Sequence, residues 1–78
     1  MALAYVLVNT EIGGEDEVLN AVKSIDAVKV ANVVYGVYDL VLMVEDPELD
    51  KLKEIVTNKI RKIPKVRSTL TMIVVGSQ

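Results

Sequence analysis

The stretch YGVYDL, residues 35–40, lies between two apolar segments at the centre of the chain. Residues 27–35 are rich in valine and residues 39–45 are almost wholly apolar, as is typical of β-strands. Gly36 lies where the two strands must turn back on each other, and a glycine readily adopts the positive φ angle that such a turn requires. The stretch therefore predicts a β-hairpin with Gly36 in its connection.

Strand and helix patterns alternate on both sides of this hairpin. Residues 3–9 and 66–75 are apolar or β-branched runs that predict strands, and a short tail follows from Gly76. Residues 15–25 and 46–63 place apolar side chains at helical spacing, and an Asp-Pro pair predicts the cap and the first position of the second helix. The order predicts a ferredoxin-like βαββαβ fold of the α+β class, with a four-stranded antiparallel sheet and two helices on one face.

The predicted sheet is apolar on both of its faces. Two apolar sets alternate along the first strand, namely Leu3, Tyr5 and Leu7 against Ala4, Val6 and Val8. Residues 39–45 repeat this pattern, whereas each helix has one apolar stripe, so the two helices can cover one face of the sheet. Monomers seldom leave an apolar patch of that extent exposed. We therefore expect a homodimer or a larger symmetric assembly that covers the second face.

Composition excludes several classes of function. A chain of 78 residues allows one domain, spanning residues 1–78. It has no cysteine and no histidine, which removes disulfides, the usual zinc sites, and Ser-His or Cys-His catalysis. No pair of carboxylates stands within an apolar segment. We therefore expect no enzyme activity, no catalytic residue, no cofactor and no metal site.

Charge and hydropathy limit the partners. Residues 1–50 hold ten acidic and two basic side chains, whereas residues 51–78 hold seven basic and one acidic. The basic residues gather near the end of the second helix, where cations favour the helix dipole. A nucleic-acid surface is disfavoured by the net charge of −2 and by the lack of aromatic residues in the third strand. The apolar start, residues 1–8, is too short to span a membrane and lacks a basic leader, so we expect a cytoplasmic protein.

Candidate ligand-binding residues lie at the hairpin and in the last strand. Asp39 opens an otherwise apolar strand, and it either accepts hydrogen bonds from backbone N–H groups of the turn or faces the ammonium group of a ligand. A charge-assisted hydrogen bond of the second kind contributes about 1.5–3 kcal/mol. Tyr38 suits either packing or a lid. Thr69 and Thr71 share one face of the last strand and Ser68 lies on the other, as ordinary strand hydroxyls or as a complement to a small zwitterion.

Residues 4–75 resemble the RAM domain, the C-terminal amino-acid-sensing domain of Lrp/AsnC transcription regulators. The segments that carry the resemblance are AYVLV (4–8), VVYGVYDLVLMV (33–44) and KVRSTLTMIVV (65–75). The second segment matches the family pattern of a glycine, two residues, an aspartate and an apolar strand, here Gly36, Asp39 and the strand from Leu40. Tyr35 departs from the small polar residue that the family often has before this glycine.

The resemblance implies an amino-acid effector bound where dimers meet. Dimers would form by packing two sheets together and would associate further into an octamer or decamer. The candidate ligand-binding residues are Gly36, Val37, Tyr38, Asp39, Leu40, Ser68, Thr69 and Thr71.

The first predicted strand begins at residue 3, which leaves no room before it for the DNA-binding domain of the family. The chain is thus similar to stand-alone RAM proteins, which would act on a partner such as a full-length Lrp/AsnC regulator or an enzyme of amino-acid metabolism. Three alternatives remain open, namely a structural oligomerisation module without a ligand, an enzyme of the dimeric α+β-barrel type, and an ACT-type amino-acid-binding domain.

Overall fold

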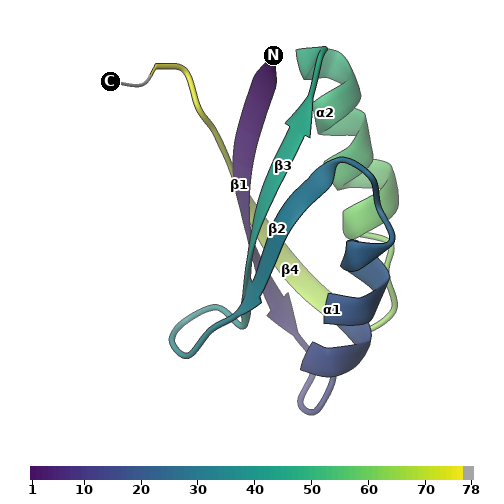
Figure 1. Ribbon diagram of the computed structural model, residues 1–78. Coiled ribbons are helices and arrows are strands. Elements are labelled where there is room, and N and C mark those ends of the chain that lie inside the picture. Colours follow the sequence, from purple (N-terminus) through teal and green to yellow (C-terminus); the bar gives the residue numbers. More distant parts are fainter. Residues whose placement is uncertain (77–78) are drawn as a thin grey trace.

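The computed structural model, which describes residues 1–76, contains one sheet and two helical segments in the order βαββαβ (Figure 1). The elements are β1 (Ala2–Thr10), α1 (Glu15–Lys23), β2 (Val28–Val33), β3 (Leu40–Asp46), α2 (Leu49–Ile55) continued by the π-helical turn η1 (Val56–Ile60), and β4 (Val66–Ile73). The strand order is β2-β3-β1-β4 and every neighbouring pair is antiparallel. The predicted ferredoxin-like fold is confirmed, and the last two residues of the predicted tail lie outside the described residues.

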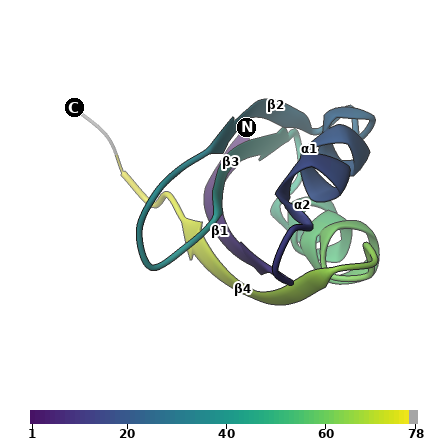
Figure 2. The ribbon, with the colours of Figure 1, turned by 90° about the horizontal axis from the view of Figure 1, so that it is seen from below.

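Both helices cover the same face of the sheet (Figure 2). Every second residue of the central strands β1 and β3 is buried beneath them, because successive side chains in a strand point to opposite faces. The helices contribute residues spaced four apart, which lie on one helix face. The buried core consists of Ala4, Val6, Val8, Val18, Val22, Leu40, Leu42, Val44, Leu52, Val56 and Ile60.

The opposite face of the sheet, which we call the open face, has no element over it in Figures 1 and 2. Tyr5 of β1 is 40% exposed, and its neighbour Met72 and nearby Leu70, both in β4, are each 45% exposed. The β2–β3 loop and residues 74–76 beyond β4 also project on this side (Figures 1 and 2). The prediction of an apolar second face is therefore confirmed for the described residues.

The two outer strands differ in how their free edges are protected. In β2 the register shifts between Val28 and Val30, so that Lys29 is an extra, bulged residue on this edge. Bulges and lysines on an edge discourage pairing with another strand. In β4 the stretch from Ser68 to Ile73 carries no charge and no proline.

Both helical segments differ at their ends from the sequence-based prediction. α1 ends at Lys23 instead of residue 25, since the Ser24 hydroxyl donates a hydrogen bond of 2.7 Å to the Ala21 carbonyl and the Ser24 N–H donates to the same oxygen at 3.3 Å. The expected cap, Asp46, is instead the last residue of β3, and its Oδ2 accepts the Glu48 N–H at 2.9 Å. The second helix therefore begins at Leu49, beyond the Asp-Pro pair.

The second helix also does not continue regularly to residue 63. After Ile55 it passes into a π-helical turn, in which the Arg61 N–H donates to the Val56 carbonyl at 3.0 Å. Val56 and Ile60 are both buried, so the wider turn keeps the apolar stripe of α2 directed at the sheet.

The loop after β1 is tied to the start of β4. The Glu11 N–H donates to the Lys65 carbonyl at 2.8 Å, and the Lys65 ammonium forms a 2.9 Å ion pair with Glu17 of α1. The hydrogen bond to Glu17, with its negative charge, raises the pKa of Lys65. Lys65 has a φ of 75°. A Cβ at Gly14 would lie 3.0 Å from the Lys65 Cβ and 3.1 Å from the Glu11 carbonyl oxygen, so a glycine fits this close approach without displacing its neighbours. The contacts fix where β4 begins.

Leu42→Ala is expected to lower the free energy of unfolding by about 2–5 kcal/mol, because it leaves a cavity in the core. Urea denaturation at a fixed protein concentration measures the loss. Ile12→Ala is the control, since this side chain is fully exposed, and we expect a change below about 0.5 kcal/mol. Equal losses for the two variants would contradict the placement of the core.

Candidate ligand-binding site

Asp39 is held at the end of the β2–β3 loop by hydrogen bonds to β1 and to Val34, the first residue after β2. Its Oδ2 accepts the Thr10 N–H at 2.8 Å and the Thr10 hydroxyl at 3.3 Å. Its own N–H donates to the Val8 carbonyl at 2.9 Å, and its carbonyl accepts the Val34 N–H at the same distance. One interpretation of the sequence was that this carboxylate accepts hydrogen bonds from backbone N–H groups. The structure agrees, but the N–H group belongs to Thr10 at the end of β1 and not to the turn that contains Asp39.

The second carboxylate oxygen of Asp39, Oδ1, makes no hydrogen bond within residues 1–76. Thr10 is only 6% exposed, so the bonds to Oδ2 satisfy polar groups that water does not readily reach. The hydrogen bonds to Oδ2 therefore fix the direction of the carboxylate, while Oδ1 can accept a hydrogen bond from a ligand.

Two hollows adjoin Asp39 on different sides. The first, which we call the acidic hollow, has a volume of about 460 Å³ and is lined by Glu15, Asp16, Val33, Val34, Tyr35 and Asp39. The second, which we call the β4 hollow, has a volume of about 370 Å³ and is lined by Asn9, Thr10, Val37, Asp39, Arg67 and Ser68. Both volumes fall in the range of small-molecule sites, which is about 300–1,000 Å³.

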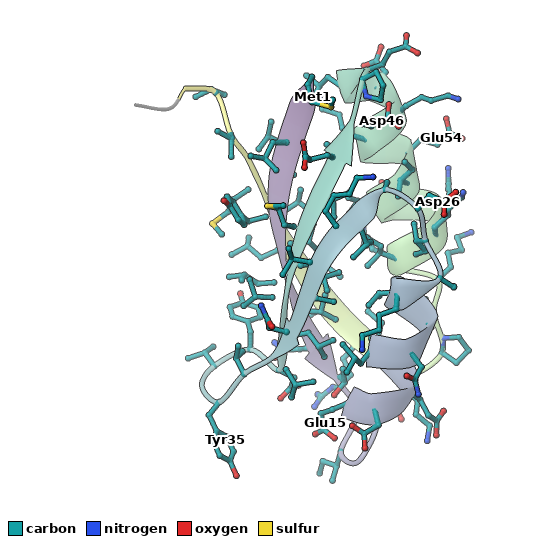
Figure 3. All side chains as sticks on the ribbon, viewed as in Figure 1. Met1, Glu15, Asp26, Tyr35, Asp46 and Glu54 are labelled. Carbon is teal, nitrogen blue, oxygen red and sulfur yellow. The ribbon has the colours of Figure 1, made fainter. Side chains whose placement is uncertain are left out.

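A third hollow, of about 490 Å³, lies at the other end of the molecule between the two helical segments and the sheet. Figure 3 shows Asp26, Asp46 and Glu54 around it, far from Glu15 and Tyr35 at the opposite end. Its lining mixes acidic and basic side chains, and the Gly36–Asp39 turn does not reach it. We therefore assign the candidate site to the two hollows beside Asp39.

The hairpin residues named from the sequence do not all reach these hollows. Gly36 has a φ of 147° with open space where a Cβ would lie, so the predicted positive φ is observed. Val37 and Asp39 line the hollows, whereas Tyr38 is half-buried beside them and lines neither. Leu40 is fully buried in the core, because it is the first residue of β3 on the helix side.

The last strand divides its hydroxyl groups between the two faces of the sheet. Thr69 pairs with Val8, and Thr71 pairs with Val6 two residues further along, so both lie on the helix side of the sheet. Neither threonine lines either hollow. Ser68 lines the β4 hollow, where its Oγ accepts a hydrogen bond of 3.3 Å from Asn9 Nδ2. Of these three predicted residues, the structure brings Ser68 to Asp39.

Several lining residues were not predicted from the sequence. Asn9, Thr10 and Arg67 reach the site because the ends of β1 and β4 meet the hairpin. Glu15 and Asp16 reach it from the first turn of α1. No local sequence pattern indicates these residues, because the register of the sheet decides where they lie. Predicting them would have required the strand order and the residue pairing between strands.

The four-stranded sheet with the Gly36–Asp39 turn is the framework of a small ligand-binding domain of the regulatory class. Among residues 1–76 no cluster of acidic, histidine or cysteine side chains could hold a metal ion. Within the same range no helix is both long and apolar enough to pass through a membrane. More particularly, the chain belongs to the Lrp/AsnC family, since the model of the Lrp/AsnC ligand binding domain matches residues 3–77.

Solved structures match this chain over nearly its whole length. FFRP-DM1 has a TM-score of 0.92 and 43% identity, covering 96% of this chain and 100% of that protein. AsnC from E. coli has a TM-score of 0.90 and 25% identity, covering 97% of this chain and 52% of AsnC. A feast or famine regulatory protein from M. tuberculosis, in complex with L-methionine, has a TM-score of 0.79 and 22% identity, covering 99% of this chain and 52% of that one; this likeness shows the fold alone. A search of curated protein sequences finds no match.

Asp39→Ala is expected to lower the free energy of unfolding by about 1–3 kcal/mol, because the Thr10 N–H loses its acceptor. Asp39→Asn keeps an oxygen acceptor, and we expect a smaller loss. Urea denaturation measures both. The control is Asp26→Ala, since Asp26 is exposed and its carboxylate makes no hydrogen bond within residues 1–76; its expected change is below about 0.5 kcal/mol. A loss no larger for Asp39→Ala than for this control would argue against the anchoring role.

Proposed function

We propose that this protein binds an amino-acid effector at the β2–β3 loop. The observation that carries the proposal is the Asp39 carboxylate, which Thr10 holds through Oδ2 between two hollows while Oδ1 remains open. A carboxylate fixed in this way is a ready partner for an ammonium group, because little further ordering is needed on binding. The L-methionine complex of the M. tuberculosis protein supports a ligand of this class for the fold.

The proposed assembly is a homodimer formed through the open face, which associates further into an octamer or decamer. Tyr5, Leu70 and Met72 supply exposed apolar surface for the first contact. Tyr35 and Val37 are exposed in the projecting β2–β3 loop, so they are available for contacts between dimers. The effector would then bind where dimers meet, beside Asp39.

The proposed mechanism is a shift between assemblies. A ligand stabilises one assembly over another by no more than its difference in affinity for the two. The protein would pass this change to a partner such as a full-length Lrp/AsnC regulator. A coverage of 100% of FFRP-DM1 supports a domain of this size acting by itself.

The second candidate function is a structural oligomerisation module without a ligand. One observation favours it: the hydrogen bonds from Thr10 give Asp39 a structural role whether or not a ligand binds. The two candidates differ in what added amino acids do to the protein.

Calorimetric titration with the twenty amino acids is expected to show binding of at least one of them to the wild-type protein. Asp39→Asn is expected to weaken that binding about tenfold or more, since a charge-assisted hydrogen bond contributes about 1.5–3 kcal/mol. Asp26→Asn removes a matched carboxylate at the other end of the molecule and is expected to leave the affinity unchanged. If none of the twenty binds, the module without a ligand is the better description.

Leu70→Asp is expected to convert the assembly to smaller species, because it places a charge on the apolar open face, opposite Leu7 of the central strand β1. Sedimentation equilibrium at micromolar concentration measures the change, and circular dichroism verifies that the variant is folded. Ile12→Asp places the same charge on a fully exposed loop residue and is expected to leave the assembly intact. A wild-type protein that sediments as a monomer would falsify the proposed dimer.

A further inference from the structure

Arg67 is the extra residue of a β-bulge beside Asp39. In the pairing of β1 with β4, Asn9 lies opposite Ser68 but Thr10 lies opposite Val66, so that Arg67 has no partner on β1. A bulge changes the direction of the side chain that it carries, and bulges are frequent beside binding sites. The side chain of Arg67 lines the β4 hollow, which Asp39 also lines.

The β4 hollow gathers donors suited to a carboxylate. Within residues 1–76 an ion pair joins Lys65 and Glu17, whereas the Arg67 guanidinium forms no ion pair in this range. A guanidinium group presents a planar fork of N–H donors that matches a carboxylate. The Ser68 hydroxyl already accepts from Asn9 Nδ2 at 3.3 Å, so its own hydrogen is free to point into the hollow.

The acidic hollow on the other side of Asp39 has the opposite character. Its charged lining residues are Glu15, Asp16 and Asp39, with no basic side chain among them. Val33 and Val34 supply apolar surface in the same hollow. A long aliphatic side chain that ends in a positive charge fits such a lining, because its stem contacts apolar groups while its charged end faces carboxylates. A negatively charged side chain would be repelled there.

We infer that Arg67 anchors the α-carboxylate of the effector and that the acidic hollow takes a positively charged side chain, so that the site selects basic amino acids. The inference rests on the proposed function and specifies its ligand. Asp39 lines both hollows, so it receives the α-ammonium group at the junction. An amino acid held in this way directs its carboxylate to one hollow and its side chain to the other.

Calorimetric titration with L-lysine, L-leucine, L-glutamate and cadaverine, which is lysine without its carboxylate, tests the inference. We expect lysine to bind about tenfold or more tightly than leucine, and glutamate more weakly than leucine. Arg67→Gln is expected to lower the affinity for lysine about tenfold or more, but to change the affinity for cadaverine by less than about twofold. Arg61→Gln removes a matched guanidinium at the end of η1 and is expected to change neither affinity. Thermal unfolding verifies that both variants keep the wild-type midpoint.

A double variant, Glu15→Gln with Asp16→Asn, separates the two hollows. We expect the double variant to lower the affinity for lysine to the level of the affinity for leucine. The affinity for leucine is expected to stay unchanged. The inference fails, while the proposed function stands, if leucine or glutamate binds as tightly as lysine, or if Arg67→Gln weakens lysine no more than Arg61→Gln does. Both fail if no amino acid binds the wild-type protein.

Discussion

The sheet of this protein is apolar on both faces, but its helices cover one face only. The position of the candidate site and the proposed assembly both depend on this constraint. β1 and β3 bury one set of side chains beneath α1 and α2 and present a second apolar set on the open face. Within residues 1–76 no helix or strand covers the open face, and this is the surface that the proposed dimer would bury. The β2–β3 loop projects on the same side, which places the candidate site beside the surface where a partner would lie (Figure 2).

The order of elements could be predicted from the sequence because it depends on strong periodic patterns. The apolar run at residues 3–9 has the length of a strand, and the spacing of Val18 and Val22 is that of a helix. The ends of the helices could not be predicted with the same accuracy, since they depend on single side-chain bonds. Asp46 is an example, because its side chain caps the turn before the helix while its backbone still belongs to β3.

The candidate site could be predicted only in part. A local motif predicted that Gly36 and Asp39 lie at the hairpin, and both residues lie there in the structure. Leu40 and Thr69 were named with them but face the helices, because the register of each strand decides which side chains share a face. Arg67 was missed for the same reason, since its direction depends on a bulge in the pairing of two strands distant in sequence.

The free edge of β4 is the less protected of the two outer edges of the sheet. From Ser68 to Ile73 this strand has no charge and no proline to discourage pairing with another extended chain, whereas β2 has Lys29 at its bulge. Before the proposed dimer forms, this edge and the apolar open face would be exposed together, so a copy without a partner would be the form most prone to aggregate.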